Sequence, residues 1–181
     1  MNTPEVSVVM SVYNGAVHLE ETLGSVLSQE GCDLEFIVVD DGSTDGTSRI
    51  LDEWAVRDTR LRVIHQENTG LTRALIRGCA AARGEFIARQ DVGDVSLPGR
   101  LQRQARRLRA DTGCVAVTCY TEYVGPLSEH LYTTKISEPD LNRALTTSNP
   151  DMLAGPAGHG SVMMRRRGYE AVGGYRASFY F

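Results

Sequence analysis

Two pairs of aspartates come shortly after apolar segments in the first half of this 181-residue sequence. They are Asp40 with Asp41, and Asp91 with Asp94. Carboxylates that gather in one place can bind a divalent cation, hydrogen-bond a ribose or transfer protons. Because an acidic pocket repels a diphosphate unless a cation lies between them, the pairs leave two interpretations open. One is a cation with a diphosphate, and the other is a nucleoside whose polar groups the carboxylates bind.

Other polar side chains also lie at the ends of apolar segments. The segments 6–12, 34–39, 61–65 and 85–88 are typical of strands buried on both faces of a parallel sheet. Ligands of such sheets bind outside the carboxyl ends of the strands. We therefore expect one crevice lined by the residues at those ends, which are Ser11, Tyr13, Asn14, Asp40, Asp41, Asn68, Asp91 and Asp94.

Helices are expected between these strands, and Asn14 is a candidate N-cap for the first. Apolar residues at helical spacing predict the inward faces of the three helices: Leu19, Leu23, Val26 and Leu27; Ile50, Leu51 and Trp54; and, within 69–83, Leu71, Ala74, Leu75, Gly78 and Ala82. Strands that alternate with helices over short connections imply right-handed crossovers. The predicted fold class is α/β, with a Rossmann-like, mostly parallel sheet flanked by helices.

The second half of the sequence predicts a more mixed set of elements. An arginine-rich helix follows Pro98, with Leu101, Ala105 and Leu108 as its apolar side. The other expected elements are a buried strand over 115–119, a strand pair within 120–134, a short helix over 138–148, a loop over 149–159, a short strand over 161–164, and a helical turn over 168–172 closed by Gly173 and Gly174. We expect a single domain over 1–181.

Composition excludes several classes of protein. Hydrophobic residues make up 41% and charged residues 23% of the sequence, as in ordinary globular proteins. A net charge of −4 argues against a nucleic-acid partner. No apolar run approaches the roughly 18–20 residues that a membrane span needs. The four cysteines, Cys32, Cys79, Cys114 and Cys119, lack the spacing of a metal site, and we expect reduced thiols in a cytoplasmic protein.

Other nucleotide-binding folds lack their signatures here. A dinucleotide-binding oxidoreductase needs the pattern GxGxxG after its first strand, whereas residues 13–16 read Tyr-Asn-Gly-Ala. The pattern GxxxxGK[ST] of a P-loop is absent from the sequence. A receiver domain needs a lysine near its aspartates, and the only lysine is Lys135. An oxidoreductase is therefore the weakest of the alternatives.

Several stretches of the sequence, in order, resemble the family 2 glycosyltransferases. They are VSVVMSVYN at 6–14, VVDDGSTDGT at 38–47, NTGL at 68–71, GEFIARQDVGD at 84–94 with SLPGRL at 96–101, HGSVMMR at 159–165 and GGYR at 173–176. Each stretch alone is weakly specific, but together they span essentially the whole chain. The resemblance implies a glycosyltransferase A-type fold and a nucleotide-sugar donor, with UDP as the expected nucleotide.

The resemblance also implies roles for single residues. Tyr13 would stack on the base, with Ser11 and Asn14 nearby. Asp41 would accept a hydrogen bond from the base edge, and Asp91 would lie near the ribose and the diphosphate. The implied cofactor is Mn²⁺ or Mg²⁺ bound by Asp91 and Asp94, which would stabilise the leaving diphosphate.

The implied reaction is a direct displacement at the anomeric carbon by an acceptor hydroxyl, with inversion. The implied acceptor is a glycan or a lipid-linked glycan of polysaccharide biosynthesis. A helix with five arginines could then contact anionic lipid at the inner face of the membrane, although solvent exposure is the default for Arg100, Arg103, Arg106, Arg107 and Arg109. The oligomeric state is not predicted.

Two departures from the family pattern matter. The acidic motif usually reads Asp-x-Asp-Asp, but here Gly93 stands where the family has the second, metal-binding aspartate. Either Asp91 or Asp94 takes over the cation, or metal binding is weak. The general base is expected beyond Phe181. The alternative function is therefore a non-catalytic fragment that binds a nucleotide-sugar.

Several residues have a structural interpretation beside the functional one. Asp40 is either a ligand or a turn residue, and Asp45 is expected in the first turn of the second helix. Gly93 is compatible with a simple tight turn. His159 is either a loop residue or a contact to the acceptor or the diphosphate. Arginines 165–167 are expected on a solvated face.

Overall fold

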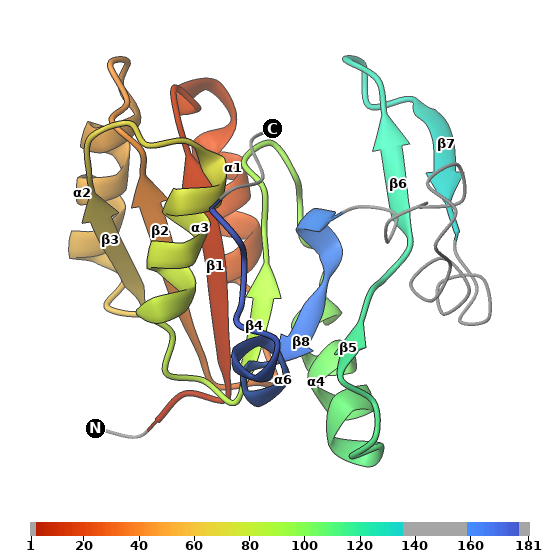
Figure 1. Cartoon of the computed structure of the whole chain (residues 1–181). Coiled ribbons are helices and arrows are strands. Elements are labelled where there is room, and N and C mark those ends of the chain that lie inside the picture. The colour runs from red at the N-terminus through yellow and green to blue at the C-terminus, as the bar shows by residue number, and fades with distance from the viewer. Residues whose placement is uncertain (1–2, 136–158, 178–181) are drawn as a thin grey trace, which may run out of the picture.

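The computed structural model describes residues 3–135 and 159–177, and it begins with strands and helices in strict alternation (Figure 1). These elements are β1 (Val6–Val12), α1 (Ala16–Leu27), β2 (Leu34–Asp40), α2 (Thr47–Arg57), β3 (Leu61–His65), α3 (Leu71–Ala80) and β4 (Phe86–Arg89). The four strands lie within a residue or two of the predicted segments. The continuous apolar runs predicted these strands correctly, because a strand that is covered on both faces has apolar residues at nearly every position.

The main sheet has six strands in the order β3-β2-β1-β4-β8-β5. The first four strands pair in parallel, so their carboxyl ends lie at one edge. Strand β8 (Met163–Arg165) runs antiparallel to β4. Because of that direction, the segment that precedes β8 lies at the same edge as the carboxyl ends of β1 to β4. The α/β class with a mostly parallel sheet is confirmed.

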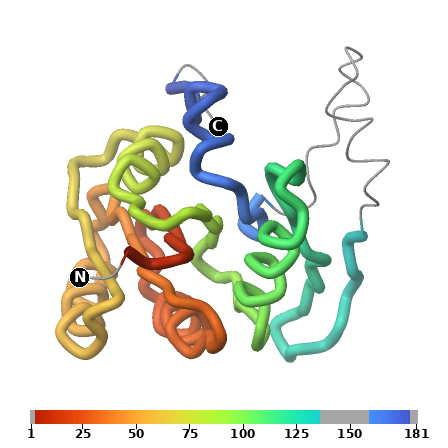
Figure 2. Tube along the Cα trace, turned by 90° about the horizontal axis from the view of Figure 1, so that it is seen from below, coloured from red at the N-terminus to blue at the C-terminus, as the bar shows by residue number. Residues whose placement is uncertain are grey.

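Helices cover both faces of the sheet and bury alternate residues of its strands (Figure 2). On one face, α1, α2 and α4 (Arg100–Ala110) pack against Val8, Met10 and Phe36. On the other face, Leu75 and Cys79 of α3 pack against Val9 and Ile87. Every residue of β1 and β2 is buried, which accounts for their continuous apolar sequences.

The second half differs from its prediction in places. The strand pair within 120–134 is present as β6 (Thr121–Val124) and β7 (His130–Thr134), which form a separate two-stranded sheet. The predicted strand over 115–119 is only β5 (Ala116–Val117), and it is not buried because it lies at the sheet edge; Val115 is 61% exposed. The helical turn is α6 (Arg166–Ala171). The predictions for 138–148 and for the loop up to residue 158 fall outside the described residues.

Three predictions at the level of residues were wrong. The N-cap of α1 is Gly15, while Asn14 takes a φ of 53° before the helix. Leu71 is 45% exposed, because α3 begins there and not at Thr69. Arg165 is buried rather than solvated: its guanidinium donates to the carbonyls of Leu108 and Asp111 at the end of α4.

No helix in the described ranges is long and apolar enough to cross a membrane.

Candidate functional site

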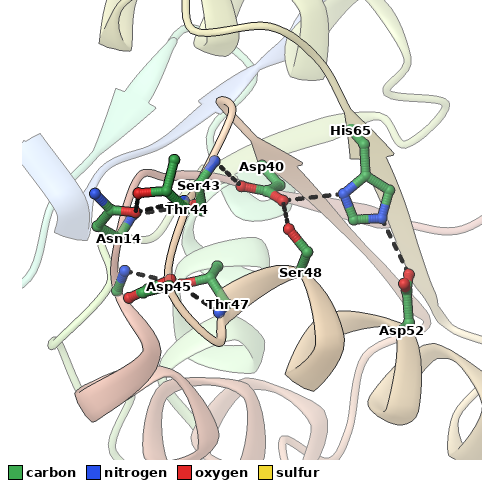
Figure 3. A network of polar contacts seen from close by, with 10 residues as sticks. Asn14, Asp40, Ser43, Thr44, Asp45, Thr47, Ser48, Asp52 and His65 are labelled. Carbon is green, nitrogen blue, oxygen red and sulfur yellow. Dashed lines mark hydrogen bonds and ion pairs between the residues drawn. The ribbon is translucent and has the colours of Figure 1, made fainter.

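The loops after β1 and β2 are locked together by hydrogen bonds (Figure 3). The Asn14 side-chain oxygen accepts from the backbone amide of Thr44 at 2.8 Å, and the Asn14 amide donates to Ser43 Oγ at 3.0 Å. The left-handed conformation of Asn14 allows both contacts, since asparagine tolerates that region better than most residues. The side chain of Asn14 thus fixes the loop on which the neighbouring Tyr13 is 52% exposed.

Asp45 occupies the start of two helices (Figure 3). Its carboxylate accepts from the backbone amides of Ala16 at 3.2 Å and of Thr47 at 2.9 Å, the first residues of α1 and α2. The charge is favourable there because helix N-termini carry partial positive charge. Since a carboxylate already sits at the start of α1, a dinucleotide phosphate cannot bind there, which argues against an oxidoreductase. The prediction that Asp45 lies in the first turn of α2 was wrong, because Asp45 precedes the N-cap Gly46 and reaches the start of the helix with its side chain.

Asp40 links β2 to α2 and β3 through its carboxylate (Figure 3). Its carboxylate accepts from Ser48 Oγ at 2.5 Å and from the Ser43 amide at 3.1 Å, and it lies 3.0 Å from Nδ1 of His65. Burial alone would raise the pKa of Asp40, but these hydrogen bonds outweigh it and lower the pKa. Of the two interpretations, the structure places Asp40 as a structural turn residue.

Asp41 is buried and links the end of β2 to the loop before α3. Its Oδ1 accepts from the Thr69 amide at 2.9 Å and from Nε2 of Gln66 at 2.6 Å, and its Oδ2 accepts from the Gly70 amide at 2.8 Å. Among the described residues Oδ2 receives one hydrogen bond, so one lone pair remains for a ligand. Ser11 is buried on the neighbouring strand β1, opposite Val39 of β2.

Three hydrogen bonds from two side chains hold the turn that carries Asp91 and Asp94. Thr22 of α1 donates to the Asp94 carbonyl at 3.1 Å and accepts from the Gly93 amide at 3.0 Å. The buried Gln90 donates to the same carbonyl at 2.9 Å. Gly93 has a φ of 94°, as a tight turn requires, and a Cβ there would meet no atom within 4 Å. The glycine therefore has a structural reason in this turn.

The side chains of Asp91 and Asp94 converge on Gly160. A Cβ at Gly160 would lie 2.7 Å from Oδ2 of Asp91 and 2.8 Å from Oδ2 of Asp94. Burial and the neighbouring Asp91 carboxylate both raise the pKa of Asp94, with burial the larger cause. Two carboxylates that repel each other in this way form an arrangement that a cation would stabilise.

Arg89 and Arg100 are residues whose part in the site the sequence analysis missed. Arg89 is fully buried; it donates to the carbonyl of Val9 at 2.7 Å and forms an ion pair with Oδ1 of Asp91 at 2.5 Å. Arg100 was expected to face solvent, but it donates to the carbonyls of Arg89 at 2.6 Å and of Gly160 at 3.1 Å. Arg89 thus binds the acidic turn at Asp91, and Arg100 ties the end of β4, just before the turn, to Gly160.

His159 begins a short 3₁₀ helix (His159–Ser161) directly before β8. Its Nε2 lies 2.8 Å from the hydroxyl oxygen of Tyr175. Burial and then the positive charge of Arg89 lower the pKa of His159. The antiparallel direction of β8 brings His159 to the same edge as Asp91, although 68 residues separate them in the sequence. The site interpretation of His159 therefore has a structural basis.

The acidic turn fits a metal ion only if a second ligand, such as a substrate phosphate, completes the coordination of the ion. Among residues 3–135 and 159–177, no group of three or more His, Cys, Asp or Glu side chains could hold a metal. Asp91 and Asp94 each direct one carboxylate oxygen to the space beside Gly160. Mg²⁺ is commonly bound by one or two carboxylates together with substrate phosphates, and two carboxylates meet that requirement.

Comparison with known proteins gives a consistent result. The family model of glycosyl transferase family 2 matches residues 7–173. The putative glycosyltransferase EpsE of Bacillus subtilis is 33% identical over 178 residues, which cover 96% of this chain and 61% of the relative. The putative teichuronic acid biosynthesis glycosyltransferase TuaG of the same organism is 34% identical over 119 residues, 65% of this chain and 47% of the relative.

Solved structures share the fold. The mannosyltransferase PcManGT of Pyrobaculum calidifontis, solved with GDP-Man and Mn²⁺, superposes with a TM-score of 0.70 at 24% identity, over 98% of this chain and 49% of that one. TarS 1-349 of S. aureus in complex with UDP gives a TM-score of 0.67 at 18% identity, over 94% of this chain and 49% of that one. The chain thus spans about half the length of these proteins.

Proposed function

The chain belongs to glycosyl transferase family 2, and we propose that it is the donor-binding part of a glycosyltransferase. The proposed reaction moves a sugar from a UDP-sugar to an acceptor hydroxyl with inversion. One observation carries the proposal: Asp91 and Asp94 converge on Gly160 at the sheet edge that also presents Tyr13 and Asp41.

We propose that the nucleoside binds over the ends of β1 and β2. The exposed ring of Tyr13 is available to stack on the base, and the remaining lone pair on Asp41 Oδ2 can accept from a base N–H. Ser11 lies at the end of β1, and Asn14 contributes chiefly by fixing the loop. The TarS complexes with UDP and UDP-GlcNAc support uracil as the base, because that protein shares the fold.

The diphosphate would lie beside the acidic turn. Asp91 and Asp94 would hold Mn²⁺ or Mg²⁺ there, and the Mn²⁺ in the mannosyltransferase complex supports that assignment. When bound, the ion would supply Lewis-acid stabilisation of the leaving diphosphate. Arg89 orients Asp91 through an ion pair with its Oδ1, so Asp91 presents its other oxygen to the ligand. His159, which directly precedes Gly160, would also contact the diphosphate.

In the displacement, the acceptor oxygen forms a bond to the anomeric carbon while the bond from that carbon to the diphosphate oxygen breaks. The acceptor proton passes to a general base, which we do not assign to a described residue of this chain. A second candidate function is nucleotide-sugar binding without transfer. Gly93 favours it, because the family pattern has a metal-binding aspartate at that position.

We propose a glycan or lipid-linked glycan as the acceptor and a cytoplasmic site of action in polysaccharide assembly. Relatives named for teichuronic acid and succinoglycan biosynthesis support this assignment. A peripheral contact with anionic lipid would use the exposed Arg103 and Arg106 of α4, because Arg109 is already paired with Glu5.

The proposal is tested by incubating the chain with UDP-glucose, UDP-GlcNAc or GDP-mannose and Mn²⁺ and measuring release of the nucleoside diphosphate. We expect slow hydrolysis of a UDP-sugar that Asp91→Asn lowers by at least about tenfold. Asp111→Asn is the matched control, because Asp111 lies at the far end of α4. Release that is equal in both variants would contradict the site. Binding of a UDP-sugar with no release would select the non-catalytic alternative.

A further inference from the structure

Tyr175 joins His159 to the rest of the C-terminal segment. Its hydroxyl oxygen lies 2.8 Å from His159 Nε2, and the two rings meet edge to face with centroids 5.6 Å apart. Among the described residues, Nδ1 of His159 has no hydrogen-bond partner. The contact with Tyr175 therefore decides which of the two ring nitrogens carries the proton when the ring is neutral.

The position of Tyr175 is itself tightly determined. Its backbone amide donates to the Tyr169 hydroxyl at 3.2 Å, and its ring packs edge to face on Tyr169 at 5.4 Å. Gly174 makes this packing possible, since it has a φ of 68° and a Cβ there would lie 2.7 Å from the Tyr169 ring. Tyr175 and Tyr169 also pack against a small core that contains Cys79 of α3. Tyr175 is thus a fixed partner and not a mobile surface side chain.

We infer that Tyr175 is a positioning residue that holds His159 in the tautomer with a proton on Nδ1, so that Nδ1–H can donate to an oxygen of the donor diphosphate. A phenol O–H donates readily to a bare imidazole nitrogen, which makes Nε2 the acceptor of this hydrogen bond. Burial of Tyr175 raises the pKa of its phenol, so the proton stays on the tyrosine. His159, which would carry this Nδ1–H, directly precedes Gly160, and Gly160 borders both aspartates.

The alternative tautomer would have a different consequence. If Nε2–H donated to the Tyr175 oxygen, Nδ1 would be an acceptor and would repel a phosphate oxygen. Burial, and then the positive charge of Arg89, lower the pKa of His159, so a neutral N–H donor is the form favoured to meet an anion here. The role of this donor rests on the proposed function, whereas the tautomer itself does not.

The tautomer is measured directly by long-range ¹⁵N NMR of the imidazole rings at pH 8. The chain has only four histidines, and His159→Gln identifies the signals of His159. We expect protonated Nδ1 and bare Nε2 in the wild-type chain, and a mixture of tautomers in Tyr175→Phe. Tyr132→Phe, on β7, is the control and should leave the signals unchanged. A protonated Nε2 in the wild-type chain, or unchanged signals in Tyr175→Phe, would overturn the inference.

The role in binding is measured by titrating UDP and, separately, uridine. Tyr175→Phe should weaken UDP binding about three- to tenfold and leave uridine binding unchanged, because only UDP carries the diphosphate. In His159→Asn, whose amide supplies a donor near the Nδ1 position, adding Tyr175→Phe should have no further effect. Equal weakening of UDP and uridine would overturn the role and indicate a structural effect. If wild type binds neither ligand, the proposed function fails while the tautomer result still stands.

Discussion

Single residues determine the shape of the space beside the acidic turn. Gly160 approaches both carboxylates so closely that any side chain must displace them. Arg89 fixes one oxygen of Asp91 and leaves the other directed to Gly160. A fixed pair of carboxylates beside an open position binds a cation better than flexible ones, because little ordering remains to be done on binding.

Gly160→Ala tests this arrangement. The new methyl group would overlap the Asp91 and Asp94 oxygens, so we expect Mn²⁺-dependent UDP binding to weaken at least about tenfold and the free energy of unfolding to fall by about 1–3 kcal/mol. Calorimetry and urea denaturation measure the two effects. Gly168→Ala is the matched control, because a Cβ at Gly168 meets its neighbours only at 3.8 Å or more. Undiminished Mn²⁺ dependence in Gly160→Ala would contradict the assignment.

Gly93→Asp restores the residue that the family pattern has at this position. Space is open there, but the φ of 94° disfavours a side chain, so we expect a loss of about 1 kcal/mol in unfolding free energy. We also expect Mn²⁺ to strengthen UDP binding more than in the wild-type chain, since a third carboxylate joins the turn. Gly93→Asn carries the same strain without the charge. If both variants bind Mn²⁺ and UDP alike, the turn is not the cation site.

At the level of elements, His65 of β3 connects β2 and α2 through Asp40 and Asp52. Each ring nitrogen lies 3.0 Å from a carboxylate oxygen (Figure 3). The hydrogen bond with Asp52 chiefly, and then the one with Asp40, raise the pKa of His65 above its ordinary 6.5, against the opposing effect of burial. These two contacts tie β3 to the end of β2, next to Asp41, and to α2.

This arrangement predicts a pH dependence of stability. Because folding raises the pKa of His65, its contribution is fully present below about pH 6.5 and is lost as the pH rises through the higher folded value. Urea denaturation between pH 5 and 9 should show this decline, and His65→Gln should remove it. Asp40 acts in the opposite direction, since its lowered pKa gives stability above about pH 3.8 that is lost in acid. A decline that persists in His65→Gln would contradict the assignment.

The elements were predictable from the sequence where the pattern is local. Strands β1 and β2 are continuous apolar runs because both their faces are covered, and the cluster of polar residues at strand ends follows from parallel pairing. Buried arginines were not predictable. Arg100 and Arg165 read as parts of charged, solvated runs, but each donates to a carbonyl that is distant in the sequence, Arg100 to Gly160 at 60 residues and Arg165 to Leu108 at 57 residues. Asp40 was left open for the same reason, since its partner His65 is 25 residues away.

For the whole molecule, the fold brings four strand ends and the start of β8 to one edge. The antiparallel β8 adds His159, which a purely parallel sheet could not have placed beside Asp91. Hydrogen bonds join the loops of Asn14 and Asp45 and place the Asp45 carboxylate at the start of α1, where its charge repels phosphate. The proposed place for the diphosphate at this edge is beside Asp91, Asp94 and Gly160.

Calorimetric titration of the chain with UDP, with and without Mn²⁺, tests this account most directly. The account predicts saturable UDP binding that Mn²⁺ strengthens by about tenfold or more, and an Asp91→Asn variant that keeps the binding but loses the Mn²⁺ effect. UDP binding that is the same with and without Mn²⁺ would contradict the cation role of Asp91 and Asp94. No UDP binding under either condition, in a chain shown to be folded by circular dichroism, would contradict the donor site itself.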